Sequence, residues 1–78
     1  MKVCIITGGS QGLGLDMAKS FSNKGFKVVV LDILECPLVE VDFIKTDLSE
    51  PIEVKNAFKL IYLLQDLIKI WLIGSFME

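Results

Sequence analysis

Two runs of apolar residues, joined by glycines and an amphipathic segment, open the chain. The run Val3–Ile6 has no polar residue among its apolar ones, which is typical of a strand covered on both faces of a sheet. A similar run spans Lys27–Asp32. Between them, apolar positions recur at helical spacing over residues 14–21, and residues 23–25 have the composition of a helix end. The pattern predicts a strand–helix–strand unit with parallel strands.

The middle of the chain predicts a short crossover followed by an edge strand. Val39, Val41 and Phe43 alternate with acidic residues, which indicates a half-exposed strand at a sheet edge. Only a few residues separate this strand from the one before it, whereas a parallel crossover usually takes about a dozen or more. We therefore expect an abbreviated loop over residues 34–39 that leaves one sheet face poorly covered.

A second helix is predicted to start at Ser49-Glu50-Pro51, where a capping residue precedes an acid and a proline. One face of this helix is apolar and comprises Val54, Ala57, Phe58, Ile61 and Leu64. The run Ile70–Ile73 fits a fourth strand or further helix, because periodicity does not decide so short a run. Residues 1–78 thus predict a single three-layer α/β domain, with a parallel sheet of three or four strands and two main helices.

Composition narrows the classes of partner. Of the 78 residues, 53% are hydrophobic, which is more than a small interior can bury, so we expect some apolar surface to face another chain. The net charge is −2 without a basic run, which argues against a nucleic-acid partner. Charged residues interrupt the apolar C-terminal third, which argues against a membrane span.

Location and metal binding are also constrained. The start of the chain does not resemble a signal peptide. The two cysteines, Cys4 and Cys36, do not make a disulfide framework, and we expect free thiols in a cytoplasmic protein. The chain has no histidine, so neither imidazole metal ligation nor histidine-based catalysis is expected.

The segment from Thr7 to Gly14 carries the most informative chemistry. It lies between a predicted buried strand and a predicted helix, where Gly8 allows a sharp turn, Gly12 leaves room for a pyrophosphate and Gly14 allows close packing of the helix on the sheet. The helix N-terminus offers N–H groups and a positive dipole end to phosphates. Asp32 ends the second strand about 20 residues downstream, as a dinucleotide fingerprint requires.

Two motifs resemble those of the short-chain dehydrogenases/reductases. Thr7-Gly8-x-x-x-Gly12-x-Gly14 is similar to the family's TGxxxGxG signature, and Thr46–Ser49 resembles its D-[VL]-[TS] segment. The resemblance runs from Lys2 to about Leu64 and implies a Rossmann-like fold, a dinucleotide cofactor and an NAD(P)-dependent oxidoreductase family. It also implies that Asp47 approaches the adenine amino group.

Asp32 indicates which cofactor is bound. A carboxylate there can accept two hydrogen bonds from the adenosine ribose and would repel a 2′-phosphate, and no Lys or Arg lies within residues 8–14. We therefore predict NAD in preference to NADP. The alternative for Asp32 is a solvated aspartate at the end of a strand. For Asp47 it is a loop aspartate stabilised by the next helix dipole.

The remaining site residues have two interpretations each. Ser10 and Gln11 contact phosphate or are exposed loop residues, Thr7 hydrogen-bonds within the turn, and Ile33 packs on adenine or fills the strand end. The full set of predicted cofactor-binding residues is Thr7, Gly8, Ser10, Gln11, Gly12, Leu13, Gly14, Asp32, Ile33, Asp47 and Leu48.

The family's catalytic groups are not found in this sequence. Members carry Tyr-x-x-x-Lys, but here Tyr62 is followed four residues later by Asp66, and we interpret Tyr62 as a packing residue. No acid able to protonate a carbonyl oxygen is identified, so we expect a truncated, catalytically incomplete NAD-binding module.

Three alternatives remain for the chain's function. The first is a self-associating protein, a homo-oligomer. It would use the outer edge of the first strand, which is open unless residues 70–73 cover it, or the apolar C-terminal segment with Trp71 and Phe76. The others are a non-functional remnant of a dehydrogenase and one half of a split enzyme.

Overall fold

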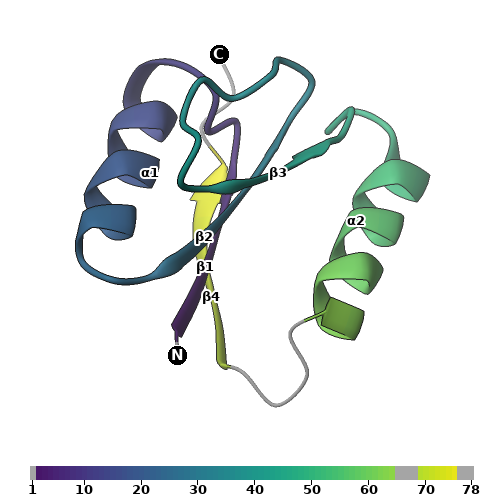
Figure 1. Ribbon diagram of the computed structural model, residues 1–78. Helices are drawn as coiled ribbons and strands as arrows, with labels where there is room; N and C mark the ends of the chain where they lie inside the picture. Colours follow the sequence, from purple (N-terminus) through teal and green to yellow (C-terminus); the bar gives the residue numbers. More distant parts are fainter. Residues whose placement is uncertain (1, 65–68, 76–78) are drawn as a thin grey trace.

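Four parallel strands form one sheet, in the order β3-β2-β1-β4, with a helix on each face (Figure 1). The computed structural model describes residues 2–64 and 69–75. The elements in chain order are β1 (Lys2–Thr7), α1 (Gly12–Asn23), β2 (Lys27–Asp32), β3 (Asp42–Lys45), α2 (Pro51–Leu64) and β4 (Lys69–Ser75). The three-layer α/β architecture predicted from the sequence is confirmed, and the run at Ile70–Ile73 belongs to a strand rather than to further helix.

Alternate side chains of β1 and β2 face opposite helices, as the pleat of a strand requires. On one face, residues 3, 5, 29 and 31 pack with Ala57 and Ile61 of α2. On the other, residues 4, 6, 28 and 30 pack with Ala18 of α1. Each of these strand side chains is at most 3% exposed. The continuous apolar runs in the sequence are therefore explained by cover on both faces.

Both cysteines are free thiols, as predicted. Cys4 lies in the core on the α1 side, and burial raises the pKa of its thiol to about 11. A thiol with so high a pKa is a poor nucleophile at neutral pH, so Cys4 serves as a small core residue.

The crossover between β2 and β3 covers the sheet better than the sequence predicts. Residues 33–41 form no regular element, yet Cys36, Leu38 and Val41 pack against the core on the α1 side. The loop thus takes the place of a helix, and the expectation of a poorly covered face was wrong. The expected strand also began too early. Pairing with β2 starts at Asp42, and Val39 is 95% exposed.

The edge position of β3 is confirmed, because β3 is the outermost strand beside β2. Its Asp42 forms an ion pair with Lys27 of β2, with 3.4 Å between Oδ2 and Nζ. The outer edge of β1 was predicted to be open unless residues 70–73 cover it, and β4 pairs along it from Lys2 to Thr7. This edge is therefore not available for self-association.

Helix α2 packs through the apolar face that its sequence predicts. Ala57 and Ile61 are buried, and Phe58 packs against them, while the side chain of Leu64 lies outside the described residues. Tyr62 was expected to pack, but its side chain is 65% exposed. It follows Ile61 by about 100° of helical rotation, which turns it out of the buried stripe. Neither described helix is long and apolar enough to cross a membrane.

Candidate dinucleotide site

The turn that follows β1 is bounded by two glycines in the left-handed region. Gly8 has φ 71° and Gly12 has φ 58°, conformations that residues with a Cβ rarely adopt. The Gly8 amide donates to the Leu31 carbonyl at 2.8 Å, so the chain leaves the sheet only after one further bond to β2. As predicted, Gly8 makes the sharp turn that separates β1 from α1.

Two further glycines permit close packing around this turn. A Cβ on Gly14 would lie 2.3 Å from the Gly8 carbonyl oxygen. The sequence predicted that Gly14 allows close packing of the helix on the sheet, but its nearest neighbour is the backbone of the turn itself. A Cβ on Gly9 would lie 3.0 Å from Val30 Cγ1 and 3.1 Å from Ile6 Cγ2. Gly9 was absent from the predicted set, because the dinucleotide fingerprint does not specify this position.

The N-terminus of α1 is suited to an anion. Gln11 occupies the cap position and makes no side-chain hydrogen bond to the helix, and the first turn has no acidic residue. The first N–H groups of a helix need partners from outside the helix and lie at its positive end. A bound phosphate supplies both a partner and a compensating charge.

Asp32 points back to the turn from the end of β2. Its Oδ2 accepts a hydrogen bond from the Ser10 amide at 3.0 Å. Its Oδ1 accepts from the amides of Ile33 at 2.7 Å and Leu34 at 3.2 Å. The residue is only 8% exposed. The alternative of a solvated strand-end aspartate was therefore wrong, because backbone donors surround the carboxylate.

Asp47 makes local contacts at the start of α2. Its Oδ1 accepts hydrogen bonds from the Ser49 hydroxyl at 2.6 Å and the Ser49 amide at 3.0 Å, and these bonds lower the pKa of its carboxyl group. Its own amide donates to Glu53 Oε1 at 3.0 Å. The helix begins at Pro51, two residues after Ser49.

Asp47 directly follows Thr46, which extends the pairing of β3 with β2. The Thr46 amide donates to the Asp32 carbonyl at 2.9 Å, which continues the β2–β3 pairing to the carboxyl end of the sheet. Leu48 packs against the core on the α2 side.

Ser10 is 6% exposed, whereas Leu13 is 63% and Ile33 is 55% exposed.

The other predicted residues lie nearby with different exposure. Gln11 and Gly12 are exposed, and Thr7 is half-buried at the end of β1. The structure thus brings Ser10 and Asp32 into contact and leaves Gln11, Leu13 and Ile33 on the surface.

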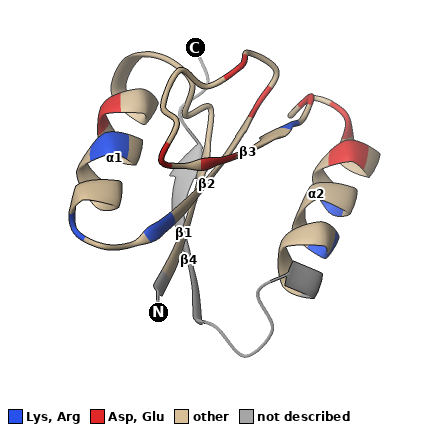
Figure 2. Cartoon of the chain, viewed as in Figure 1, with Lys and Arg blue, Asp and Glu red and all other residues tan. Residues whose placement is uncertain are grey.

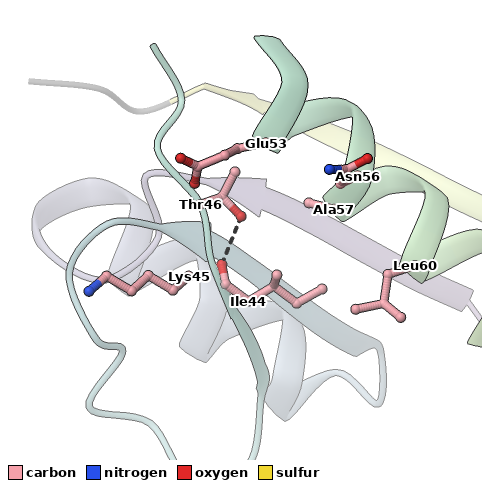
Figure 3. A pocket seen from close by; sticks show the side chains of 7 residues that line it. All are labelled: Ile44, Lys45, Thr46, Glu53, Asn56, Ala57 and Leu60. Carbon is pink, nitrogen blue, oxygen red and sulfur yellow. Dashed lines mark hydrogen bonds between the residues drawn. The ribbon is translucent and has the colours of Figure 1, made fainter. Parts of the chain in front are cut away.

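A separate hollow of about 210 Å³ lies between β3 and α2 (Figure 3). Its lining residues are Ile44, Lys45, Thr46, Glu53, Asn56, Ala57 and Leu60. The Thr46 hydroxyl donates to the Ile44 carbonyl at 3.0 Å, and Glu53 accepts from the Asp47 amide. None of the predicted cofactor-binding residues lines this hollow, and two of its polar side chains are already engaged.

Acidic residues lie mainly along the crossover loop, at the start of β3 and at the start of α2 (Figure 2). Lysines lie mainly along the helices and near the amino end of β2. Among the described residues, no three cysteine or acidic side chains lie close enough together to hold a metal ion. The site therefore combines a helix N-terminus for anions with acidic surroundings, without a metal centre in the described part of the chain.

Comparison with known proteins places this geometry in a family. The family model for short chain dehydrogenases matches residues 2–72. This chain belongs to the short-chain dehydrogenase family. An uncharacterized oxidoreductase of Thermotoga maritima is 39% identical over 69 residues, which cover 74% of this chain and 27% of that protein. An NADP-dependent dehydrogenase of Cochliobolus lunatus is 57% identical over 35 residues, or 45% of this chain and 12% of that protein.

Solved structures of short-chain dehydrogenases share the fold. The ligand-free aldohexose dehydrogenase of Thermoplasma acidophilum superposes with a TM-score of 0.84 and 29% identity, covering 99% of this chain and 31% of that one. A 4-hydroxyisoleucine dehydrogenase complexed with NADH has a TM-score of 0.74 and 31% identity, covering 82% of this chain and 28% of that one. The chain thus spans less than a third of the length of these relatives.

Proposed function

We propose that this chain binds the adenosine half of NAD, with the pyrophosphate at the N-terminus of α1 and the ribose at Asp32. The observation that carries the proposal is the contact between the two parts of the site, the hydrogen bond from the Ser10 amide to Asp32 Oδ2. It holds the carboxylate beside the turn whose helix offers uncapped N–H groups. Dinucleotide use by solved relatives supports the same assignment.

The proposed preference for NAD over NADP rests on charge. A 2′-phosphate on the ribose would approach the buried carboxylate of Asp32, and no cation lies in residues 8–14 to offset the repulsion. One relative is an NADP-dependent dehydrogenase, so family membership alone does not decide between the cofactors. The decisive feature is the residue at position 32.

The adenine is proposed to lie beside the ends of β2 and β3. Asp47 and Leu48 follow β3, and Ile33 follows Asp32 with more than half of its surface exposed. An exposed apolar side chain next to the ribose-binding carboxylate supplies a surface on which a base can pack. Asp47 directly follows Thr46, whose amide donates a hydrogen bond to the Asp32 carbonyl.

For the complete enzymes of this family, the reaction we propose is hydride transfer between the nicotinamide and a substrate. For the present 78 residues, we propose NAD binding without turnover. The chain has one tyrosine, Tyr62, with aspartate rather than lysine four residues later. Tyr62 lies on α2 with its side chain exposed, whereas the helix that begins at the glycine turn is α1.

Calorimetric titration of the purified chain tests the proposal. We expect weak but saturable binding of NAD and weaker binding of NADP. Asp32→Asn should weaken NAD binding and narrow the difference between the two cofactors. Asp42→Asn is the matched control, because it removes an exposed carboxylate from the next strand. Absence of NAD binding at millimolar concentration, or equal affinities for wild type and Asp32→Asn, would overturn the proposal.

A further inference from the structure

The outer edge of β3 carries backbone groups that the sheet does not use. β3 is the outermost strand beside β2, and the described part of the chain supplies no strand beyond it. The Thr46 amide donates to the Asp32 carbonyl, so Thr46 directs its backbone at β2. Backbone direction alternates along a paired strand, so Ile44 also faces β2, whereas Phe43 and Lys45 direct their N–H and C=O groups outward. An outward row of this kind is a template for a further strand.

A second copy of β3 matches these groups when it runs antiparallel. A twofold axis normal to the sheet can pass beside Ile44, so that Ile44 lies directly opposite the partner's Ile44. Phe43 then lies opposite the partner's Lys45, and Lys45 lies opposite the partner's Phe43. Outward-facing residues that lie opposite one another in an antiparallel pair exchange both of their N–H···O bonds. This one register therefore uses every outward group of Phe43 and Lys45 in both copies.

The charges at the two ends of β3 favour the antiparallel direction. Asp42 begins the strand and Lys45 ends it, and Figure 2 shows the acid and the cation at opposite ends. Antiparallel pairing brings the basic end of each copy beside the acidic end of the other, whereas parallel pairing would align like charges. Lys45 is exposed and Phe43 is half-buried, so the lysine stem can cover the accessible part of the partner's Phe43.

Apolar surface lies on the other face of this edge. Ile44 is half-buried and lines the hollow between β3 and α2 together with Leu60 (Figure 3). Leu60 is 44% exposed. Residues that lie opposite one another in an antiparallel pair share a face of the sheet, so the partner's Ile44 would extend the apolar lining of the hollow across the edge. Burial of these side chains adds a hydrophobic contribution to the backbone bonds.

We propose that a second copy of this chain pairs antiparallel with β3, with Ile44 opposite the partner's Ile44, so that two four-stranded sheets join into one sheet of eight strands. This interaction surface lies at the opposite edge of the sheet from β4 and does not depend on NAD binding. Only a short strand takes part, so we expect a weak dimer whose population rises with protein concentration.

A cysteine cross-link tests the register. Ile44→Cys, made in a Cys36→Ser background, places two thiols opposite each other at a Cα separation of about 4.5 Å, which a disulfide can span. We expect mild oxidation to give a covalent dimer on non-reducing gels. Lys45→Cys in the same background is the matched control. Its two copies lie diagonally across the axis, more than about 7 Å apart, and should cross-link far less.

A proline at the edge tests the backbone bonds. Lys45→Pro removes an N–H that faces away from β2, so the β2–β3 pairing keeps its own bonds, and circular dichroism checks the fold. By symmetry each dimer loses two hydrogen bonds, each worth about fivefold, so the dissociation constant from sedimentation should rise about twenty-fivefold. Lys45→Gln is the control, because it keeps the N–H, and it should raise the constant by less than about fivefold.

The outcomes separate this edge from other surfaces. A wild-type chain that stays monomeric up to about 1 mM would overturn the inference. So would a dimer whose dissociation constant Lys45→Pro leaves unchanged, because association would then use another surface, such as the apolar C-terminal segment. Equal cross-linking of Ile44→Cys and Lys45→Cys would contradict the register. The cross-linking comparison decides the matter alone if Lys45→Pro does not fold.

Discussion

The two halves of the carboxyl edge are built in different ways. At the β1–α1 turn, the contacts join residues far apart in sequence, such as Ser10 and Asp32, which are 22 positions apart. At the β3–α2 junction, the side-chain bonds of Asp47 and Ser49 join residues two positions apart, and they are exposed. The first region depends on the folded sheet for its geometry, whereas the second depends on its own short segment.

The difference teaches which part of the site is held most firmly. A turn tied to a buried carboxylate cannot move without breaking a bond between elements, and its glycines leave no space for side chains. An Asx-type turn forms from local sequence and contributes little to the position of the sheet. We therefore expect substitutions at the turn to affect folding and binding together, and substitutions at Asp47 to have smaller effects.

Gly14→Ala should have the largest effect. The new Cβ would lie 2.3 Å from the Gly8 carbonyl oxygen, and this neighbour is backbone, so the turn or α1 must shift. We expect a loss of about 3 kcal/mol in the free energy of unfolding, the upper range for overpacking. Denaturant unfolding followed by circular dichroism measures it.

Gly25→Ala is the control for Gly14→Ala. A Cβ at Gly25 meets nothing within 4 Å, although its φ of 87° is strained for alanine. We expect a loss of about 1 kcal/mol from that strain. Equal losses for the two variants would show that the close approach of α1 to the turn does not matter for stability.

Asp32→Asn should rank next. The amide has one acceptor oxygen, so its NH₂ group must face backbone donors that the carboxylate now accepts. We expect a loss of about 2 kcal/mol in the free energy of unfolding. Asp47→Asn provides the comparison within the site and should change stability far less. A larger loss at Asp47 than at Asp32 would reverse the ranking of the two regions.

The sequence predicted the β1–α1 turn and its flanking strands better than the segment from the crossover loop to α2. The apolar runs of β1 and β2 predicted strands covered on both faces, and the structure confirms that cover. Gly8 makes the predicted turn with a positive φ. The buried position of Ser10 was not predictable. It results from a contact across 22 residues that no local pattern records.

The errors fall where local pattern and tertiary contacts compete. Alternating residues at Val39 and Val41 indicated a strand, but pairing partners on β2 begin only at Asp42. Tyr62 lies beside apolar neighbours in sequence, yet helical rotation places it outside the buried stripe. The path of the crossover loop over the α1 side depends on packing by Cys36 and Leu38, which periodicity does not encode.

Acid titration sharpens the comparison at Asp47. Hydrogen bonds from Ser49 lower the pKa of its carboxyl group in the folded chain below its ordinary value. A carboxyl whose pKa is lower when folded stabilises the fold above its unfolded pKa, and this contribution is lost as the pH falls through the folded pKa. Wild type should therefore be slightly more stable than Asp47→Ala at neutral pH, and the difference should shrink below about pH 4. Thermal melts across this range measure it, and a difference that grows with acidity would contradict the assignment.

Salt concentration should have the smallest effect, which we expect in the ratio of NAD to NADP affinity. The carboxyl edge is acidic (Figure 2), and NADP brings an additional phosphate to it. Between about 0.01 M and about 1 M salt, the screening length falls from about 30 Å to about 3 Å. Long-range repulsion from exposed acids should then fade, while repulsion by the buried Asp32 persists. We expect the ratio of NAD to NADP affinity to fall by only about twofold over this range. A much larger fall would mean that the surface acids, and not Asp32 at the turn, set the preference.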